Sequence, residues 1–361
     1  MCGPCAPDGA DGFALVAAAR EAADELLGRL GVPVAKALDL SSPRGFDRAV
    51  VAFADELRRQ AAPADVEALR AAVAVLDVDW RRTTPEGRRR LVAEATARAA
   101  RATEGVPRSL EATFGRAAER VVGAMRGELR RRQGLAVAAD FNAVDRRVVA
   151  YARTSQTGFV RDAYGRRHAA LSAEARRLVA EGLAQGLGQG DLAETLAGAA
   201  RRHLVERARP YWDLVASAFV GNARAYGQVS AYAEAGVERY VLRAVLDEVT
   251  TPQCRFLDGK VFAVRDALAR FERLESAEAP EAIVDLRPWL REGPDPDGGG
   301  RRLYVRRGGE RVTVARVVRS GAGARDDRGA FAGDPGERAL SGFGLDLPPF
   351  HAHCRTTTTP A

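Results

Sequence analysis

Apolar side chains recur three, four and seven residues apart through the first two thirds of the chain, and this spacing predicts amphipathic helices. Two helix starts are marked by a hydroxyl residue followed by proline, at Ser42 and Thr84. The hydroxyl accepts a backbone N–H that the helix leaves unpaired, and proline fits the first helical position because its missing N–H would not have bonded there. Pro63 and Pro107 are expected to begin two further helices. With a loosely amphipathic stretch over residues 12–30, the pattern predicts about six helices before residue 155.

The middle of the chain predicts a helical hairpin followed by a long helix. A capped helix is expected to open at Ser172, and a glycine-rich turn over residues 186–191 leads into another helix over residues 192–203. The long helix spans about residues 208–235 and ends at Gly236. Four large apolar residues at helical spacing predict its buried face: Trp212, Val215, Phe219 and Tyr226.

Beyond the long helix the pattern changes from helix to strand. β-Branched and apolar residues favour strands over residues 240–249 and 261–264. Residues 301–320 predict a hairpin that turns at two consecutive glycines. Two segments poor in apolar residues, 292–297 and 321–336, are expected to be surface loops.

The predicted fold class is mainly α with a small α+β C-terminal domain, in which an elongated helical region is followed by a short mixed sheet. We divide the chain into an N-terminal helical region over residues 1–155, a second helical part over 156–237 and the small α+β part over 238–361. Length allows several domains, and no apolar stretch reaches the roughly 20 residues that cross a bilayer, so we expect no membrane contact.

Positive charge gathers in one helical segment. The chain has a net charge of +7, whereas residues 81–132 alone hold 14 arginines and 6 glutamates. Such a segment is either a solvated helical face or a surface that faces nucleic acid. The candidate DNA contacts, here called the arginine candidates, are Arg88, Arg89, Arg90, Arg130, Arg131 and Arg132.

Chemistry-bearing residues gather in two segments about a hundred residues apart. Asp247 and Cys254 follow a predicted strand, and His351, His353 and Cys354 follow a pair of prolines. Thiolate and imidazole are ligands that zinc prefers, so the two cysteines and two histidines make a four-ligand set, with Asp247 or water replacing one histidine if geometry demands it.

Two other interpretations of this cluster stay open. A disulfide between Cys254 and Cys354 would close a long loop and contribute on the order of 4 kcal/mol. Alternatively, the cysteines and histidines pack without metal or bond. Arg255 and Arg355, which follow the two cysteines, either pair with Asp247 and Asp258, lower the thiol pKa values, or stay solvated.

Taken together, the two segments resemble the phage Mu F-like head-morphogenesis family. The resemblance is carried by Asp-x-x-Thr-x-x-x-Cys over residues 247–254 and by Pro-Pro-x-His-x-x-Cys-Arg over residues 348–355, and it extends over about residues 171–359. It implies a structural minor head protein of a phage or phage-derived particle, and not an enzyme. We expect it in the virion, and in the host cytoplasm during assembly.

The resemblance also implies partners. These are the phage portal protein and the inner capsid or scaffold, with double-stranded DNA as a further partner and no small-molecule substrate. Residues 1–155 would then face the portal or DNA. The alternative function is a metal-dependent hydrolase, a nuclease or protease, that uses Cys254, His351, His353 and Cys354.

The other cysteines and histidines of the chain are not expected to form a functional site. Cys2-x-x-Cys5 is not expected to bind metal. His168 and His203 lie in arginine-rich helical surroundings, and both are expected at the surface.

Overall fold

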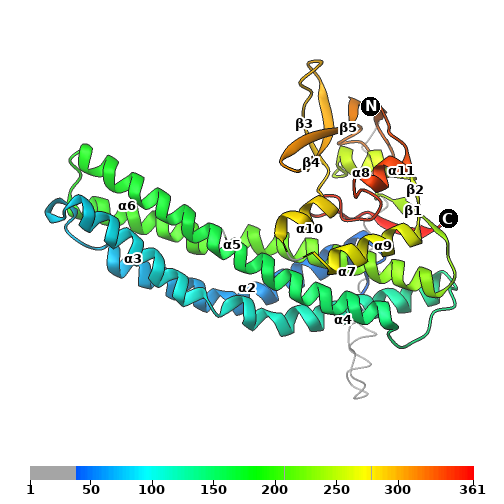
Figure 1. Ribbon diagram of the computed structural model, residues 1–361, viewed down its shortest axis with the longest axis horizontal. Helices are drawn as coiled ribbons and strands as arrows, with labels where there is room; N and C mark the ends of the chain where they lie inside the picture. The colour runs from blue at the N-terminus through cyan, green and yellow to red at the C-terminus, as the bar shows by residue number, and fades with distance from the viewer. Residues whose placement is uncertain (1–37, 207, 278) are drawn as a thin grey trace, which may run out of the picture. The chain divides into compact units, whose positions relative to one another are not determined.

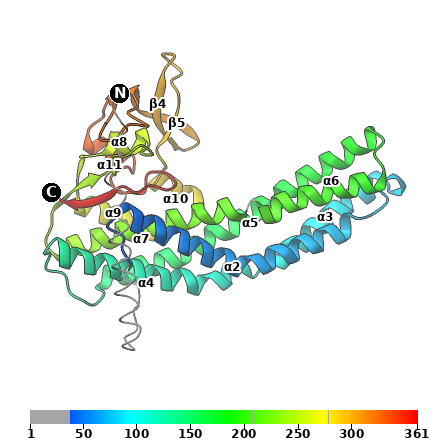
Figure 2. The ribbon, with the colours of Figure 1, turned by 180° about the vertical axis from the view of Figure 1, so that it is seen from behind.

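Long helices form the first part of the chain (Figures 1 and 2). The computed structural model describes residues 38–206, 208–277 and 279–361, so the predicted helix over residues 12–30 and the Cys2-x-x-Cys5 pair lie outside the described residues. The helical elements are α2 (Pro43–Leu76), the 3-10 turn η1 (Trp80–Arg82), α3 (Pro85–Thr103), α4 (Val106–Arg132), α5 (Ala143–Ala184), α6 (Gln189–Arg201), the π-helical turn η2 (Arg202–Glu206) and α7 (Ala208–Glu234). Within the unit Asp39–Ala361, α2 packs against α3 and α7, while α4 packs against α5 and α7.

Local capping explains where several of these helices begin. The Ser42 hydroxyl accepts the Gly45 N–H at 3.0 Å, and the Thr84 hydroxyl accepts the Gly87 N–H at 3.0 Å. Pro107 occupies the first turn of α4. These three predicted starts are confirmed, because each depends only on residues next to one another in the sequence.

Two other predicted helix starts are wrong. Pro63 lies inside α2, and Ser172 lies inside α5, a helix of 42 residues. Buried residues continue on both sides of Pro63, with Ala61 and Ala68 fully covered, so burial of one unbroken face outweighs the hydrogen bond that proline removes. Ser172 is itself buried and accepts a hydrogen bond from Arg176 at 2.9 Å instead of capping a helix.

The C-terminal part contains two small antiparallel sheets. Strand order is β2-β1-β7 in the first sheet and β3-β4-β5-β6 in the second. The elements are β1 (Arg239–Arg243), α8 (Pro252–Leu257), β2 (Val261–Ala263), α9 (Val264–Glu275), α10 (Pro280–Leu286), β3 (Arg291–Pro294), β4 (Arg301–Arg307), β5 (Glu310–Arg319), β6 (Ala330–Ala332), α11 (Glu337–Gly342) and β7 (Thr357–Pro360). Strand β7 pairs with β1 from Tyr240↔Pro360 to Arg243↔Thr357, so the last residues return to the first strand.

The strand predictions are partly confirmed. β1, β2 and the β4–β5 hairpin form where expected, and Gly308 and Gly309 turn the hairpin with φ of 56° and 85°. The two predicted loops each contain a strand, β3 and β6, which complete the second sheet. Residues 245–249 are not a strand, because hydrogen bonds to Thr250 fold them into a turn.

The long helix α7 provides the core on which the C-terminal part rests. Trp212, Val215, Phe219 and Tyr226 are all buried, as predicted. Further along α7, Tyr232 packs in one apolar cluster with residues of the first sheet and of the C-terminal segment. The fold is therefore mainly α with a small α+β C-terminal part, as the sequence predicts.

One of the two predicted domain limits lies inside a helix, and the other lies between two elements. The limit near residue 155 lies within α5, whereas the limit near residue 237 coincides with the change from α7 to β1. Among the described residues, no helix is long and apolar enough to cross a membrane.

Candidate functional site

Two segments far apart in the sequence meet at a cluster of two thiols and one imidazole. Cys254 lies on α8, and Cys354 lies between the turn at residues 351–353 and strand β7. Both side chains are buried. The Cys254 Sγ lies 2.9 Å from the His351 Nε2 and 3.6 Å from the Cys354 Sγ. We call Cys254, His351 and Cys354 the thiol–imidazole cluster; their donor atoms all lie within 4.8 Å of one another.

The orientation of His351 is fixed from its other side. Its Nδ1 lies 2.5 Å from the Ala352 carbonyl oxygen, which can only accept, so Nδ1 carries the proton and donates it. In the neutral ring Nε2 is then the acceptor, and it lies 2.9 Å from both the Thr251 hydroxyl and the Cys254 thiol. The acceptor lone pair of the His351 Nε2 therefore points into the cluster.

The pKa values of the two thiols shift in opposite directions. A hydrogen bond from the Cys354 thiol lowers the pKa of Cys254 against the effect of burial, and Thr251 and the charge of Arg355 act in the same direction. Burial and the same hydrogen bond hold the pKa of Cys354 well above its usual value. Cys254 is therefore the more acidic of the two thiols.

Of the predicted ligands, His353 and Asp247 stand apart from the cluster. His353 is exposed, its φ is 56°, and its backbone N–H donates to the Ser217 hydroxyl at 2.8 Å. Its side chain borders a cavity of about 290 Å³ that also reaches Cys254 and His351. The structure thus brings together three of the five predicted metal residues.

Asp247 joins the two halves of the motif by an ion pair. Its carboxylate accepts two hydrogen bonds from Arg355 Nη2, at 2.8 and 2.6 Å, and one from the Thr250 hydroxyl at 2.7 Å. Burial alone would raise the pKa of Asp247, but these hydrogen bonds and the charge of Arg355 lower it. The Asp-x-x-Thr pattern is therefore a turn whose carboxylate binds the arginine that follows Cys354.

Arg255 binds backbone carbonyls, whereas pairing with the side chain of Asp247 or Asp258 was one of the alternatives that the sequence suggested. It is buried, and its guanidinium donates to backbone carbonyls of Thr250 at 3.1 Å, Ala324 at 2.7 Å and Asp247 at 2.5 Å. Asp258 pairs with Arg328 instead, at 2.8 Å. Arg255 thereby fastens the turn that precedes α8 to the loop before β6.

Polar residues on α7 bind the C-terminal segment, and sequence analysis missed them. The buried Arg224 donates to the Thr356 carbonyl at 2.5 Å, and burial lowers the pKa of Arg224 to about 10. One turn on, Gln228 donates to the Thr358 carbonyl at 3.2 Å, and after another turn the Tyr232 hydroxyl donates to the same carbonyl at 2.9 Å. The available signal was the spacing of these polar residues, four apart on one face of a helix rich in apolar residues.

Gly221 lets the C-terminal segment approach α7 closely. A Cβ at this position would lie 3.1 Å from the Pro349 Cγ. The proline pair of the motif thus packs directly on the helix backbone, just ahead of His351 in the sequence.

The arginine candidates do not form one patch. Arg88, Arg89 and Arg90 lie in the first turns of α3, and the other three end α4. The two helices follow each other in nearly the same direction (Figure 1). About 40 residues of helix at 1.5 Å each separate the two groups by roughly 60 Å. Most of these side chains are exposed, although Arg89 pairs with Glu86 at 2.7 Å.

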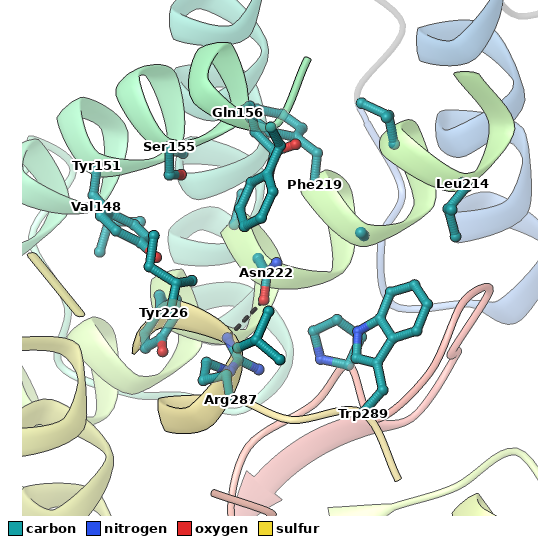
Figure 3. A pocket seen from close by; sticks show the side chains of 18 of the residues that line it. Val148, Tyr151, Ser155, Gln156, Leu214, Phe219, Asn222, Tyr226, Arg287 and Trp289 are labelled. Carbon is teal, nitrogen blue, oxygen red and sulfur yellow. Dashed lines mark hydrogen bonds between the residues drawn. The ribbon is translucent and has the colours of Figure 1, made fainter. Parts of the chain in front are cut away.

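A second concave site lies between α5, α7 and α10 (Figure 3). Its volume is about 330 Å³, and its walls are mainly apolar and aromatic, with Phe219 and Trp289 among them. Its lining contains three arginines, namely Arg166, Arg287 and Arg291, and no acidic residue. The buried hydroxyl of Tyr211, which also lines it, has no hydrogen-bond partner among the described residues. We call this site the α5–α7 groove.

The structure combines a long helical part with a small C-terminal module that holds two buried cysteines. Residues 176–359 match the family described as Phage Mu protein F like protein. Because this match covers just over half of the chain, the chain belongs to that family and is a phage head-related protein. The resemblance predicted over residues 171–359 is confirmed. No curated protein and no solved structure matches the chain significantly.

Proposed function

We propose that the protein is a structural component of a phage head which binds another head protein during assembly and catalyses no reaction. The observation that carries this proposal is the family match, which takes in the last part of α5, α6, α7 and the C-terminal module as far as Thr359. The positions that mark the family support it, since Asp247 and Arg355 bind each other and Pro349 packs on α7. These contacts hold two segments together and engage the Asp247 carboxylate with Arg355.

The α5–α7 groove supports a specific binding surface. Apolar walls with a few polar groups are typical of sites that bury a partner side chain. Its three arginines and lack of acids favour a segment with an apolar side chain next to an acidic one. The expected partner is the portal protein or an inner capsid or scaffold protein, and the complex forms in the host cytoplasm before the protein enters the virion.

Co-expression with the portal protein tests the proposal. Val284 lines the groove and is 46% exposed, so Val284→Asp should abolish co-purification by placing a carboxylate on an apolar surface. Val318 is 69% exposed on β5 and does not line the groove, so Val318→Asp is the matched control and should bind normally. Normal DNA-filled heads in the absence of the protein, together with no co-purification of the native pair, would refute the assembly role.

A metal-dependent hydrolase is the second candidate function. It is favoured by the cavity of about 290 Å³ beside the thiol–imidazole cluster, which gives a substrate access to Cys254 and His351. This function requires that the purified protein cleave a peptide or nucleic acid and that Cys354→Ser remove the activity. Absence of cleavage by metal-loaded protein would exclude it.

A further inference from the structure

The thiol–imidazole cluster has the donor types of a zinc site. Two thiols and one imidazole suit Zn²⁺, whereas Mg²⁺ and Ca²⁺ prefer oxygen ligands. All three side chains come from segments that other contacts already hold in place: Cys254 from α8, and His351 and Cys354 from the turn beside α7. A metal would therefore find its ligands close together without a large rearrangement.

Two of the three distances in the cluster can be compared with those of a tetrahedral site, and the third donor pair, His351 and Cys354, lies within 4.8 Å. With Zn–S near 2.3 Å and Zn–N near 2.0 Å, neighbouring ligand atoms lie about 3.5 to 3.8 Å apart. The Cys254 and Cys354 sulfurs are 3.6 Å apart, which already matches. The Cys254 Sγ and the His351 Nε2, at 2.9 Å, must separate by roughly half an ångström, and His351 is only partly buried and borders the cavity.

The surroundings of His351 are those of a metal ligand. Histidines that bind zinc usually donate the proton of the other ring nitrogen to a carbonyl or carboxylate, which fixes the ring and its tautomer. The Nδ1 of His351 lies 2.5 Å from the Ala352 carbonyl oxygen, and this leaves Nε2 as the ligand atom.

Charge near the cluster is compatible with a divalent cation. Two guanidiniums act on the cluster. That of Arg355 is paired with Asp247 at 2.6 Å, so its repulsion is offset, and that of the buried Arg224 interacts with Cys354 and favours its thiolate form. Zn²⁺ with two thiolates is neutral as a group, which lowers the cost of keeping it in a buried place. Binding would release the protons of both thiols to solvent.

We propose that Cys254, His351 and Cys354 bind one Zn²⁺, with the fourth position on the side of the 290 Å³ cavity and filled by water. The ion would join α8 to the segment that precedes β7. His353 is not a ligand in this arrangement, and Asp247 acts only by holding Arg355. This proposal does not depend on the function proposed above, because it concerns the isolated protein.

Metal analysis of the full chain tests the proposal. The experiment uses a Cys2→Ser/Cys5→Ser background, so that only Cys254 and Cys354 remain of the four cysteines. We expect about one zinc per chain, and Co²⁺ added to the metal-free protein should give the charge-transfer absorption of two thiolate ligands. His351→Ala should lower zinc affinity more than the roughly 10- to 100-fold typical of changing a residue that only hydrogen-bonds to a ligand.

Matched variants decide between the possible outcomes. His353→Ala, two residues from His351 and exposed, should keep full zinc binding. Cys354→Ser should lose it, and because this variant removes a buried thiol, far-UV circular dichroism must show that it folds. The proposal is overturned if the background protein takes up neither Zn²⁺ nor Co²⁺, if His353→Ala weakens binding as much as His351→Ala, or if thiol counting without reductant finds Cys254 and Cys354 joined as a disulfide.

Discussion

Removal of the Asp346 carboxylate should strongly destabilise the C-terminal module. Asp346 is fully buried and accepts two hydrogen bonds from Arg270, from Nε at 3.0 Å and from Nη2 at 3.1 Å. Arg270 is 5% exposed. Asp346→Ala leaves this guanidinium buried without its counter-charge, and its remaining carbonyl partners cannot neutralise it.

The magnitude follows from the depth of this pair. Breaking a buried ion pair from one side costs about 3 to 5 kcal/mol, whereas replacing both partners by apolar residues of similar size is often close to neutral. The double variant Arg270→Met/Asp346→Leu should therefore recover most of the loss. If the roughly 320 residues of Asp39–Ala361 unfold together, 4 kcal/mol lowers Tm by about 6 °C; if only the roughly 120 residues of the C-terminal part unfold, the shift is about 15 °C.

Urea and thermal unfolding followed by circular dichroism give these values. Asp297→Ala is the control, because the Asp297 side chain is 72% exposed and lies 3.6 Å from Arg316, so its loss should cost less than about 1 kcal/mol. A cost below about 1 kcal/mol for Asp346→Ala, or a double variant no more stable than the single one, would show that the pair does not carry the stability we assign to it.

Three further predictions concern α7, a buried histidine and the arginine candidates. Gly221→Val should lower the free energy of unfolding by about 1 to 3 kcal/mol, measured with urea, because the new side chain overpacks Pro349. Gly158→Ala in α5, where a Cβ meets nothing within 4 Å, should raise it by about 0.5 to 1 kcal/mol. Equal effects of the two variants would contradict the close approach of Pro349 to Gly221. Burial, aided by the charge of Arg167, lowers the pKa of His168 to about 4, so between pH 6.5 and pH 4 the unfolded chain binds a proton that the folded chain does not. The free energy of unfolding should therefore drop by at most about 2 kcal/mol from pH 7 to pH 5. This pH dependence should be smaller in His168→Gln. If the arginine candidates contact DNA, affinity for a duplex should fall with salt concentration, as measured by fluorescence anisotropy. The magnitude of the slope of log affinity against log salt should decrease by about 0.9 for each contact removed by Arg→Gln. An affinity that does not change with salt excludes DNA contact.

The parts of the fold that the sequence predicted are those set by neighbouring residues. The caps at Ser42 and Thr84 and the two-glycine turn of the β4–β5 hairpin need only a few consecutive residues to form. Pro63 and Ser172 failed as helix starts because packing along α2 and α5 outweighs local signals. His168 and His203, expected at the surface, are buried: their neighbouring arginines on the same helices gave no sign of the elements that cover them.

The candidate site was predicted in its composition but not in its geometry. The motif named Cys254, His351 and Cys354, and the structure brings them together. Spacing could not separate the role of His351 from that of His353, because that depends on the backbone turn after Phe350, in which His353 takes a φ of 56°. Whether the cluster binds metal stays a prediction, as does DNA contact by the arginines.

The antiparallel pairing of β7 with β1 has a consequence for the order of folding. Cys254 and Cys354 become buried together only when residues 357–360 have reached β1, across about a hundred residues of intervening chain. Contacts so distant in sequence form late, since closing a long loop costs entropy before any contact is gained. We expect both thiols to be accessible to solvent and to oxidants until then. The rate at which a thiol reagent stops labelling Cys254 and Cys354 would therefore time the completion of the native chain, and premature oxidation would trap chains that have not yet reached it.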